Sequence, residues 1–492
     1  MFSKAMLRSI LVIAFLFALN ACVSFSPKAL SPSDSSYCEY FYQSFDDLVD
    51  KAGVHDAQAA IVDGFPFLSV NRFLVSFKQE LNTTEKFQFW LSWLAKLNLQ
   101  ARDIEWKNLP QHNRTEFSKY FLQNTSFQQQ LQFCSTQLSN NIDSQKQKKL
   151  IAQISVPENY SQAKRVLGLY PVSSLFVSNQ IDKHQKTTRE QFSLKLERMP
   201  VKGQLKRYAF SGEAVNFTQT HSVPLSADNP LDIPNITGQE LNDLFKQYAP
   251  ILEIDEHDFN DKPGSIYLDQ HGSVMLDVEK PVAYLLPSFT RFKNQILLQL
   301  NYVFWFPSRP KISWFDIYGG HLDGLIWRVT LNENGKPIAY DSIHACGCYH
   351  KFYINEALEF NESLARQQRE PPFVAQVLSA EEMAISPVIR LSSGEHYVQR
   401  VYPLGENEKS YSAYSMKSYD DLRSLSVGDE FKSLFEANAL VSGSERAERW
   451  LLWPMGVLSA GAMRQWGNHA VAFVGKRHFD DPYLFDRYFN IK

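Results

Sequence analysis

The chain has 492 residues, of which 44% are hydrophobic and 14% are aromatic, so it can bury sizeable cores and does not have the composition of a disordered protein. Its 50 lysine and arginine residues and 53 aspartate and glutamate residues give a formal net charge of −3, with no basic block or basic–aromatic array. This balance excludes nucleic acid as an expected partner. The length is enough for roughly two to four domains.

Residues 1–21 form a predicted secretory signal peptide. Lys4 and Arg8 give a basic start, residues 10–19 are an apolar run, and Ala21 is a small residue before the expected cleavage point. The run is too short to span a bilayer, which takes about 20 apolar residues. No second segment of the sequence is long and apolar enough to do so.

A cysteine follows the signal directly. Residues 19–22, LNAC, resemble the bacterial lipobox, although Asn20 is unusual at its position. The resemblance implies cleavage before Cys22, a thioether-linked lipid and N-acylation, with palmitate as an expected label. Val23 rather than Asp comes next, which by resemblance to the enterobacterial sorting rule favours the outer membrane. We therefore expect a protein of the bacterial cell envelope that is held at the outer membrane by its lipid. The alternative is an ordinary signal peptide followed by a chance cysteine.

Residues 22–39 are the lipidated cysteine and a tether rich in Ser and Pro, and residues 40–150 are a predicted helical region. Phe73, Phe77 and Leu81 recur at helical spacing, and residues 82–85, NTTE, carry cap-type residues before a second such run. Four cysteines other than Cys22 enter an oxidising compartment. We expect Cys38 and Cys134, near the two ends of the helical region, to form a disulfide.

Residues 151–235 change to short segments with turn residues, which predicts mixed strands and loops. Residues 236–395 hold the clearest strand pattern. In residues 296–306, ILLQLNYVFWF, every even position is apolar, which is typical of a strand with a preferred buried face. Residues 396–492 are expected to complete this body. The predicted fold class is α+β, with an N-terminal helical region followed by a β-rich, β-sandwich-like body.

A hairpin is predicted around Asn334-Gly335, because Asn-Gly suits a two-residue turn and an alternating strand precedes it. In that register Leu325 lies opposite His344. Because alternate residues of a strand point to the same face, five side chains that can ligate a metal should lie on one face. These five are His321, Asp323, His344, Cys346 and Cys348. Directly opposed Cβ atoms lie about 4.5–5.5 Å apart, so the group should form a cluster. A three-residue loop would swap the two faces.

Metal chemistry suits this cluster, because zinc accepts imidazole, thiolate and carboxylate ligands, and His and carboxylate alone could hold Mn²⁺ or another divalent ion. We predict one divalent metal ion, with zinc as the first choice. His350, Asp316 and His469 could reach the same cluster as accessory groups. Two alternatives stay open: Cys346 and Cys348 form a tight, redox-active disulfide, or the cluster is a hydrogen-bonded structural patch.

Four segments resemble Vps62-related proteins: residues 247–256 (QYAPILEIDE), 302–307 (YVFWFP), 320–323 (GHLD) and 342–344 (SIH). The same layout occurs in NPP1-type necrosis-inducing proteins. The resemblance covers residues 244–350 and implies a β-sandwich in which His, Asp and Glu bind a divalent cation. Two departures are visible, because the His-to-Asp spacing is one residue shorter and Leu325 stands where the family has Glu. Loss of that carboxylate weakens a Ca²⁺ or Mg²⁺ site, and the nearby cysteines shift the preference toward zinc or copper.

These observations predict an outer-membrane lipoprotein with a divalent-metal-dependent site for glycan or lipid headgroups, a ligand class that comes from the resemblance alone. One alternative is a metal-assisted hydrolase, in which the ion activates water and Asp323 or a free histidine handles protons. Another is a structural envelope lipoprotein without a metal. The sequence contains no serine-hydrolase elbow, phosphate-binding loop or zincin helix.

Overall fold

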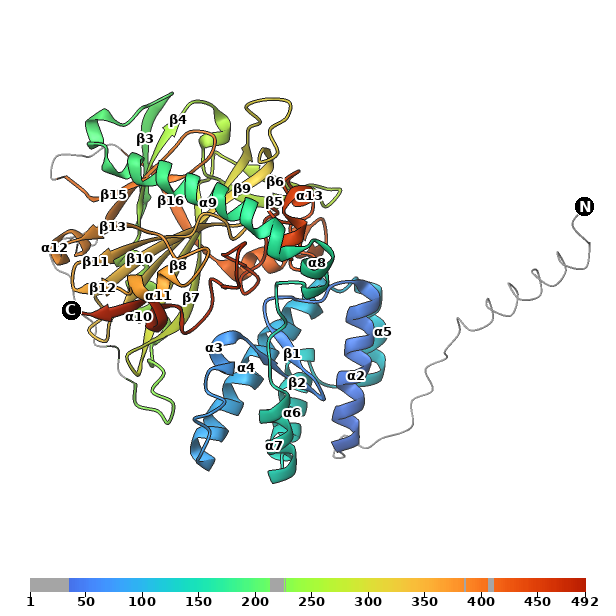
Figure 1. The fold of residues 1–492 in the computed structure, drawn as a ribbon. Coiled ribbons are helices and arrows are strands. Elements are labelled where there is room, and N and C mark those ends of the chain that lie inside the picture. Colours follow the sequence, from blue (N-terminus) through green and yellow to red (C-terminus); the bar gives the residue numbers. More distant parts are fainter. Residues whose placement is uncertain (1–34, 213–224, 226, 385, 406–410) are drawn as a thin grey trace, which may run out of the picture.

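The computed structural model describes residues 35–212, 225, 227–384, 386–405 and 411–492. An N-terminal group of helices stands beside a larger β-rich body (Figure 1), which confirms the predicted α+β class. The signal peptide, Cys22 and most of the tether lie outside the described residues. Among the residues that are described, no helix has the length and apolar character needed to cross a membrane.

The predicted helical region is confirmed. Its elements are α2 (Ser35–Ala52), β1 (Ala60–Val62), β2 (Phe65–Val70), α3 (Arg72–Val75), α4 (Thr84–Asn108), α5 (Gln111–Phe121), α6 (Phe127–Asn140) and α7 (Ser144–Gln153). Thr83 caps α4, since its hydroxyl accepts a hydrogen bond from the Lys86 N–H at 3.3 Å. Ser126 and Gln129 form a capping box at the start of α6. The helical spacing of Phe73, Phe77 and Leu81 corresponds to only one helical turn, α3, although Phe73 is buried as expected.

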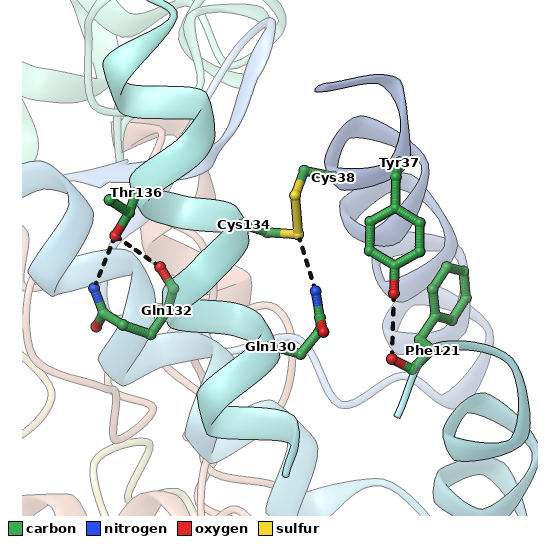
Figure 2. Close-up of a disulfide and its surroundings, with 7 residues drawn as sticks. All are labelled: Tyr37, Cys38, Phe121, Gln130, Gln132, Cys134 and Thr136. Atoms are coloured by element: carbon green, nitrogen blue, oxygen red, sulfur yellow. Dashed lines mark hydrogen bonds between the residues drawn. A yellow bond between two sulfur atoms is a disulfide. The ribbon is translucent and has the colours of Figure 1, made fainter. Parts of the chain in front are cut away.

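Cys38 and Cys134 form the predicted disulfide, which joins α2 to α6 (Figure 2). Both sulfurs are buried, and the Gln130 side-chain amide donates a hydrogen bond to the Cys134 Sγ at 3.5 Å. Trp106 of α4 stacks on Phe127 of α6 with ring centroids 4.2 Å apart. The disulfide and these aromatic rings hold the helices around one apolar core.

The prediction of strands and loops for residues 151–235 is wrong for much of that segment. It contains α8 (Gln162–Leu167), α9 (Tyr170–Ser193), η2 (Leu196–Arg198) and β3 (Gln204–Phe210). The long helix α9 is weakly amphipathic, and its buried side chains are only Ser174, Thr188 and Phe192. A helix that buries so few apolar residues lacks the periodic signal on which sequence prediction depends.

The β-rich body is built on one mixed sheet of eleven strands in the order β13-β11-β10-β9-β8-β7-β16-β3-β4-β14-β15. Besides β3, the strands of this sheet are β4 (Ile251–Glu256), β7 (Val282–Phe292), β8 (Gln295–Arg309), β9 (Gly320–Leu331), β10 (Pro337–His344), β11 (Lys351–Asn355), β13 (Val374–Leu378), β14 (Pro387–Leu391), β15 (Val398–Pro403) and β16 (Ser412–Ser418). Residues 396–492 thus supply two of these strands, as expected.

Short elements surround this sheet. The two-stranded pairs are β5 (Ser265–Leu268) with β6 (Val274–Asp277), β12 (Leu358–Phe360) with β19 (Phe489–Ile491), and β17 (Leu425–Val427) with β18 (Glu430–Lys432). The remaining helices are α10 (Gly238–Gln247), η3 (Phe259–Asp261), α11 (Glu362–Arg366), α12 (Ala380–Met383), η4 (Tyr419–Arg423), α13 (Arg449–Leu452), η5 (Trp453–Met455) and α14 (Leu484–Tyr488).

The sheet curls until its two edge strands meet. The Gln376 side chain of β13 donates to the Val401 carbonyl of β15 at 2.6 Å and accepts from the Val401 N–H at 3.2 Å. Helix α9 contacts both edge strands and runs across the sheet (Figure 1). Inside the curl, Phe304 and Trp327 pack in one core with Ile389 from the other half of the sheet. The predicted alternation of residues 296–306 is confirmed, with the even positions from Leu298 onward facing this core.

The β9–β10 hairpin keeps the predicted register but not the predicted turn. Leu325 pairs with His344, as expected. The turn is a three-residue loop, because Asn332 N–H donates to the Lys336 carbonyl at 2.8 Å. A register shift after Pro337 then restores the expected pairing. This bulge compensates for the extra loop residue and keeps the faces from being exchanged.

Candidate functional site

The structure brings together two of the five clustered residues predicted from the hairpin. Asp323 and His344 are buried on the same sheet face, with the Asp323 Oδ1 3.6 Å from the His344 Nδ1. His321 is exposed, and its Nε2 lies 3.2 Å from the Val274 carbonyl oxygen. Leu322, between His321 and Asp323, has a left-handed backbone with φ +55°, so the strict alternation assumed by the prediction does not hold at this point.

The two cysteines do not continue the β10 strand. β10 ends at His344, and a turn follows in which the Gly347 N–H donates to the His344 carbonyl at 2.7 Å. Both thiols are free. Cys346 packs in the core on the opposite face of the sheet, whereas Cys348 lines a cleft. They therefore do not lie opposite Asp323 and His321 as the extended register predicted.

His396, which the sequence analysis missed, is the main partner of Asp323. Its Nδ1 lies 2.8 Å from the Asp323 Oδ2, and its Nε2 lies 3.2 Å from the Asn260 carbonyl and 3.6 Å from the Asp261 carboxylate. Phe306 stacks on the imidazole at 4.0 Å. Burial alone would lower the pKa of His396, but the hydrogen bonds to Asp261 and Asp323 outweigh it and raise the pKa to about 8. At neutral pH this is a buried imidazolium between two carboxylates.

This arrangement commits both oxygens of Asp323 to imidazole nitrogens. Burial would raise the pKa of Asp323, but His344 and His396 hold it well below its ordinary value. Within the described part of the chain, no group of three or more His, Cys, Asp or Glu side chains is arranged to hold a metal ion. The donors as placed do not fit the implied divalent cation, so no step of the function proposed below passes through a metal. Metal binding stays a prediction.

The three accessory residues have separate surroundings. Asp316 accepts hydrogen bonds from the backbone N–H groups of Ile312 and Tyr318, at 3.1 and 2.8 Å, and so shapes a loop. His469 is buried beside Trp466 and Phe479. His350 forms part of a polar group described below. Asp316 and His350 both line the cleft that Cys348 lines.

That cleft, about 1030 Å³ in volume, lies beneath α9. Its floor comes from consecutive residues at the β10–β11 connection: Cys348, Tyr349, His350 and Lys351. One wall is α9, where His184 contacts Tyr349 at 5.2 Å between ring centroids. The opposite wall includes α13 and η5. The curl of the sheet and the strand-end turn together therefore present four different functional groups to one cleft.

His350 has one nitrogen in a hydrogen bond and one buried nitrogen without a partner among the described residues. Asp341 and Arg328, directly opposite each other on β10 and β9, form a buried two-hydrogen-bond ion pair at 2.8 and 2.6 Å. The His350 Nε2 donates to the same Asp341 carboxylate at 2.8 Å. Burial lowers the pKa of His350 to about 4 although Asp341 opposes the shift. The neutral ring then carries its proton on Nε2, so the buried Nδ1, which has no partner among the described residues, is an acceptor.

Two cations lie on the cleft floor. Lys351 is only 4% exposed, and its ammonium sits 5.2 Å from the Tyr397 ring centroid. Burial lowers the pKa of Lys351 to about 8, with Glu395 opposing. Within the described residues no carboxylate forms an ion pair with Lys351. Arg309 donates to the hydroxyls of Tyr349 and Tyr397 at 3.4 and 3.1 Å and lies 3.7 Å from Glu395.

The opposite wall adds one buried carboxyl group. Burial raises the pKa of Glu448 to about 7, although Arg309 and two other arginines oppose the shift. A carboxyl group with this pKa is partly protonated near neutral pH and adds less negative charge to the cleft than an ordinary glutamate. The cleft is therefore lined by both charges, with the carboxyl groups of Glu395 and Glu448 near the Arg309 and Lys351 cations.

The mouth of the cleft is apolar. Phe176 of α9, Ile312 and Leu451 line it and are 70, 84 and 66% exposed. Trp314 and Trp450, close to them in sequence, are 91 and 71% exposed. Large apolar groups are seldom left together in water on a monomeric protein, and such a rim marks an interaction site. The cleft thus combines a polar floor, which includes the buried ammonium of Lys351, with exposed apolar side chains.

Comparisons of the chain with family models, curated proteins and solved structures found no match.

Proposed function

We propose that this protein is an outer-membrane lipoprotein that binds an anionic, hydroxyl-bearing amphiphile in the cleft beneath α9, namely a lipid headgroup together with part of its acyl chain. The proposal depends on one observation. The cleft floor holds a buried ammonium, Lys351, with no carboxylate within ion-pair distance among the described residues, and exposed apolar side chains line the same cleft.

The charge of Lys351 supports an anionic ligand. An ammonium group removed from water loses several kcal/mol of hydration free energy unless it is paired. A bound phosphate or carboxylate would offset that loss through charge-assisted hydrogen bonds in a partly desolvated space. Arg309 donates to two tyrosine hydroxyls in the same cleft, and a ligand anion would share its charge with Glu395.

The free nitrogen of His350 supports a hydrogen-bond donor in the ligand. Because Asp341 fixes the proton on Nε2, the Nδ1 lone pair accepts a hydrogen bond from water or from a hydroxyl or N–H group of a ligand. Sugars and glycerol-based lipids carry hydroxyl groups beside their phosphate or carboxylate. A headgroup with a hydroxyl group next to a phosphate or carboxylate therefore suits the His350 and Lys351 side chains on this floor.

The apolar entrance supports an acyl chain. The volume of about 1030 Å³ is at the upper end of the range of about 300–1,000 Å³ for small-molecule sites. Each methylene of a chain buried against Phe176 and Leu451 would contribute about 0.8 kcal/mol. A free glycan would leave these side chains exposed to water, so we favour a lipid over a soluble sugar.

The test is a binding measurement on the full-length protein in detergent, with oleoyl lysophosphatidic acid as the probe. Lys351→Met removes the charge and keeps the length, and we expect it to weaken binding at least tenfold, or about 1.4 kcal/mol. Lys119→Met, at an exposed lysine of α5, is the matched control and should bind like the wild type. Equal dissociation constants for the Lys351 variant and the wild type would contradict the proposal.

Elemental analysis of the same preparation tests the metal-dependent form of the proposal. If the protein contains one equivalent of zinc or another divalent ion, and chelation abolishes probe binding, the result supports a metal-dependent binding site. Probe binding that survives chelation supports recognition of the anion by Lys351 without a metal. Release of oleate from the probe would favour the hydrolase alternative.

The anchor is tested separately with Cys22→Ser, at a position outside the described residues. We expect the variant to lose acylation and to remain unprocessed or soluble. Continued fractionation with the outer membrane and labelling with palmitate would contradict the lipobox interpretation.

A further inference from the structure

Cys346 and Cys348 form a close thiol pair on the cleft floor that the proposed lipid binding does not use. Gly347 separates them and has φ +93°, which folds the chain so that the Cys348 N–H donates to the Cys346 Sγ at 3.4 Å. Both thiols are free, in contrast to the buried disulfide of the helical region. The pair therefore occupies a turn in which one thiol can reach the other.

Glycine is required for this turn. A Cβ on residue 347 would lie 2.7 Å from the Ala470 carbonyl oxygen, and the backbone angle is one that other residues seldom adopt. The neighbouring strand end and the Ala470 segment thus hold Cys346 and Cys348 in a fixed relation. A surface loop without such contacts would not keep the two thiols together.

The two thiols differ in access. Cys346 is only 6% exposed and packs with Ile343 and Met463 in an apolar cluster. Cys348 lines the cleft beneath α9 and is partly exposed. A small molecule in the cleft can therefore meet Cys348, whereas Cys346 does not line the cleft.

We propose that Cys348 and Cys346 are a thiol–disulfide exchange site for a low-molecular-weight disulfide that enters the cleft. The hydrogen bond with Cys346 and burial raise the pKa of the Cys348 thiol well above its ordinary value, so Cys348 attacks one sulfur of the disulfide only as it gives up its proton. The S–S bond of the small molecule breaks, a mixed disulfide forms at Cys348, and the first thiolate leaves and takes up the proton that Cys348 lost. Cys346 then attacks the Cys348 sulfur, the Cys346–Cys348 bond forms, and the second thiol leaves with the proton from Cys346. The protein is oxidised by two electrons and the disulfide is reduced to two thiols.

The structure assigns different roles to the two cysteines: Cys348 is the attacking thiol and Cys346 is the resolving thiol. This asymmetry follows from burial and is independent of the lipid. Failure of the lipid-binding experiment would leave the exchange proposal unaffected, and the reverse also holds.

Oxidised glutathione is the probe, applied to full-length protein that has been equilibrated with reduced glutathione and desalted. In the wild type we expect one equivalent of probe to release two equivalents of glutathione. The peptide that contains residues 346–348 should then be lighter by two hydrogens and resist alkylation. The buried Cys38–Cys134 disulfide provides an internal reference that should not change.

Single variants separate the roles. Cys346→Ala, which keeps the core apolar, should retain one glutathionyl group at Cys348 because no resolving thiol is present. Cys348→Ser should stay unmodified, because Cys346 is buried. Equal glutathionylation of both variants, or a wild type that keeps both thiols alkylatable in excess probe, would overturn the proposal. If Cys346→Ala does not fold, the stoichiometry of glutathione release by the wild type decides the question.

Discussion

The buried ion pair beneath the cleft makes Asp341→Asn the most informative stability test. Asp341 and Arg328 are 0 and 2% exposed, and the carboxylate holds the guanidinium through two hydrogen bonds. Asparagine has the same shape but no charge, so the variant leaves an arginine cation buried without its partner. Removal of one member of a buried pair costs about 3–5 kcal/mol. His350 also loses the anion that orients its ring.

Denaturant unfolding followed by intrinsic fluorescence measures this loss as a shift in midpoint. Asp277→Asn is the matched control, because Asp277 pairs with Lys280 at the surface, where an ion pair contributes about 0–1 kcal/mol. If the two variants lose the same free energy of unfolding, to within about 1 kcal/mol, the argument that Arg328 depends on a buried partner is wrong.

Three further predictions concern the pH dependence, the turn and the disulfide. Folding raises the pKa of His396 from 6.5 to about 8, so its stabilisation, about 2 kcal/mol, is present below pH 6.5 and is lost as the pH rises through 8. His396→Gln should flatten this decline in unfolding midpoints measured at each pH, and an unchanged slope would contradict the assignment. Gly347→Ala should lower the melting temperature more than Gly428→Ala. Both glycines have a left-handed backbone, but only a Cβ at residue 347 would meet another atom, the Ala470 carbonyl oxygen at 2.7 Å. Equal shifts in melting temperature would show that the turn is not confined. Replacing both Cys38 and Cys134 with Ala should cost roughly 4–5 kcal/mol in denaturant unfolding, because the bond closes a loop of 96 residues; an unchanged midpoint would refute this.

Local patterns were sufficient for much of the fold. The cap residues around Thr83, the alternation of residues 296–306 and the cysteine pair of the helical region all led to elements that the structure contains. These features depend on neighbours in sequence or on a simple redox argument. Helix α9 was missed because it buries little apolar surface and covers a cleft, which leaves no periodic pattern.

The candidate site was predictable only in part. Asp323 and His344 came together because the hairpin register was right. His396 could not be found in this way, because it reaches Asp323 from a distant loop and has a left-handed backbone with φ +52°. The sequence also held a signal for the buried ion pair, because the same register sets Arg328 opposite Asp341 on two strands that are buried along most of their length.

The central strand β16 has a consequence for how the chain reaches this fold. It is inserted between β3 and β7 and is parallel to both, although it follows them far along the sequence. Until residues 412–418 are available, β3 and β7 each present an unpaired edge, and the sheet exists as two separate pieces. Exposed edges of this kind recruit other chains. A fragment that stops before residue 412 should therefore aggregate, and sheet closure is expected to be a late, slow event that follows folding of the helical region.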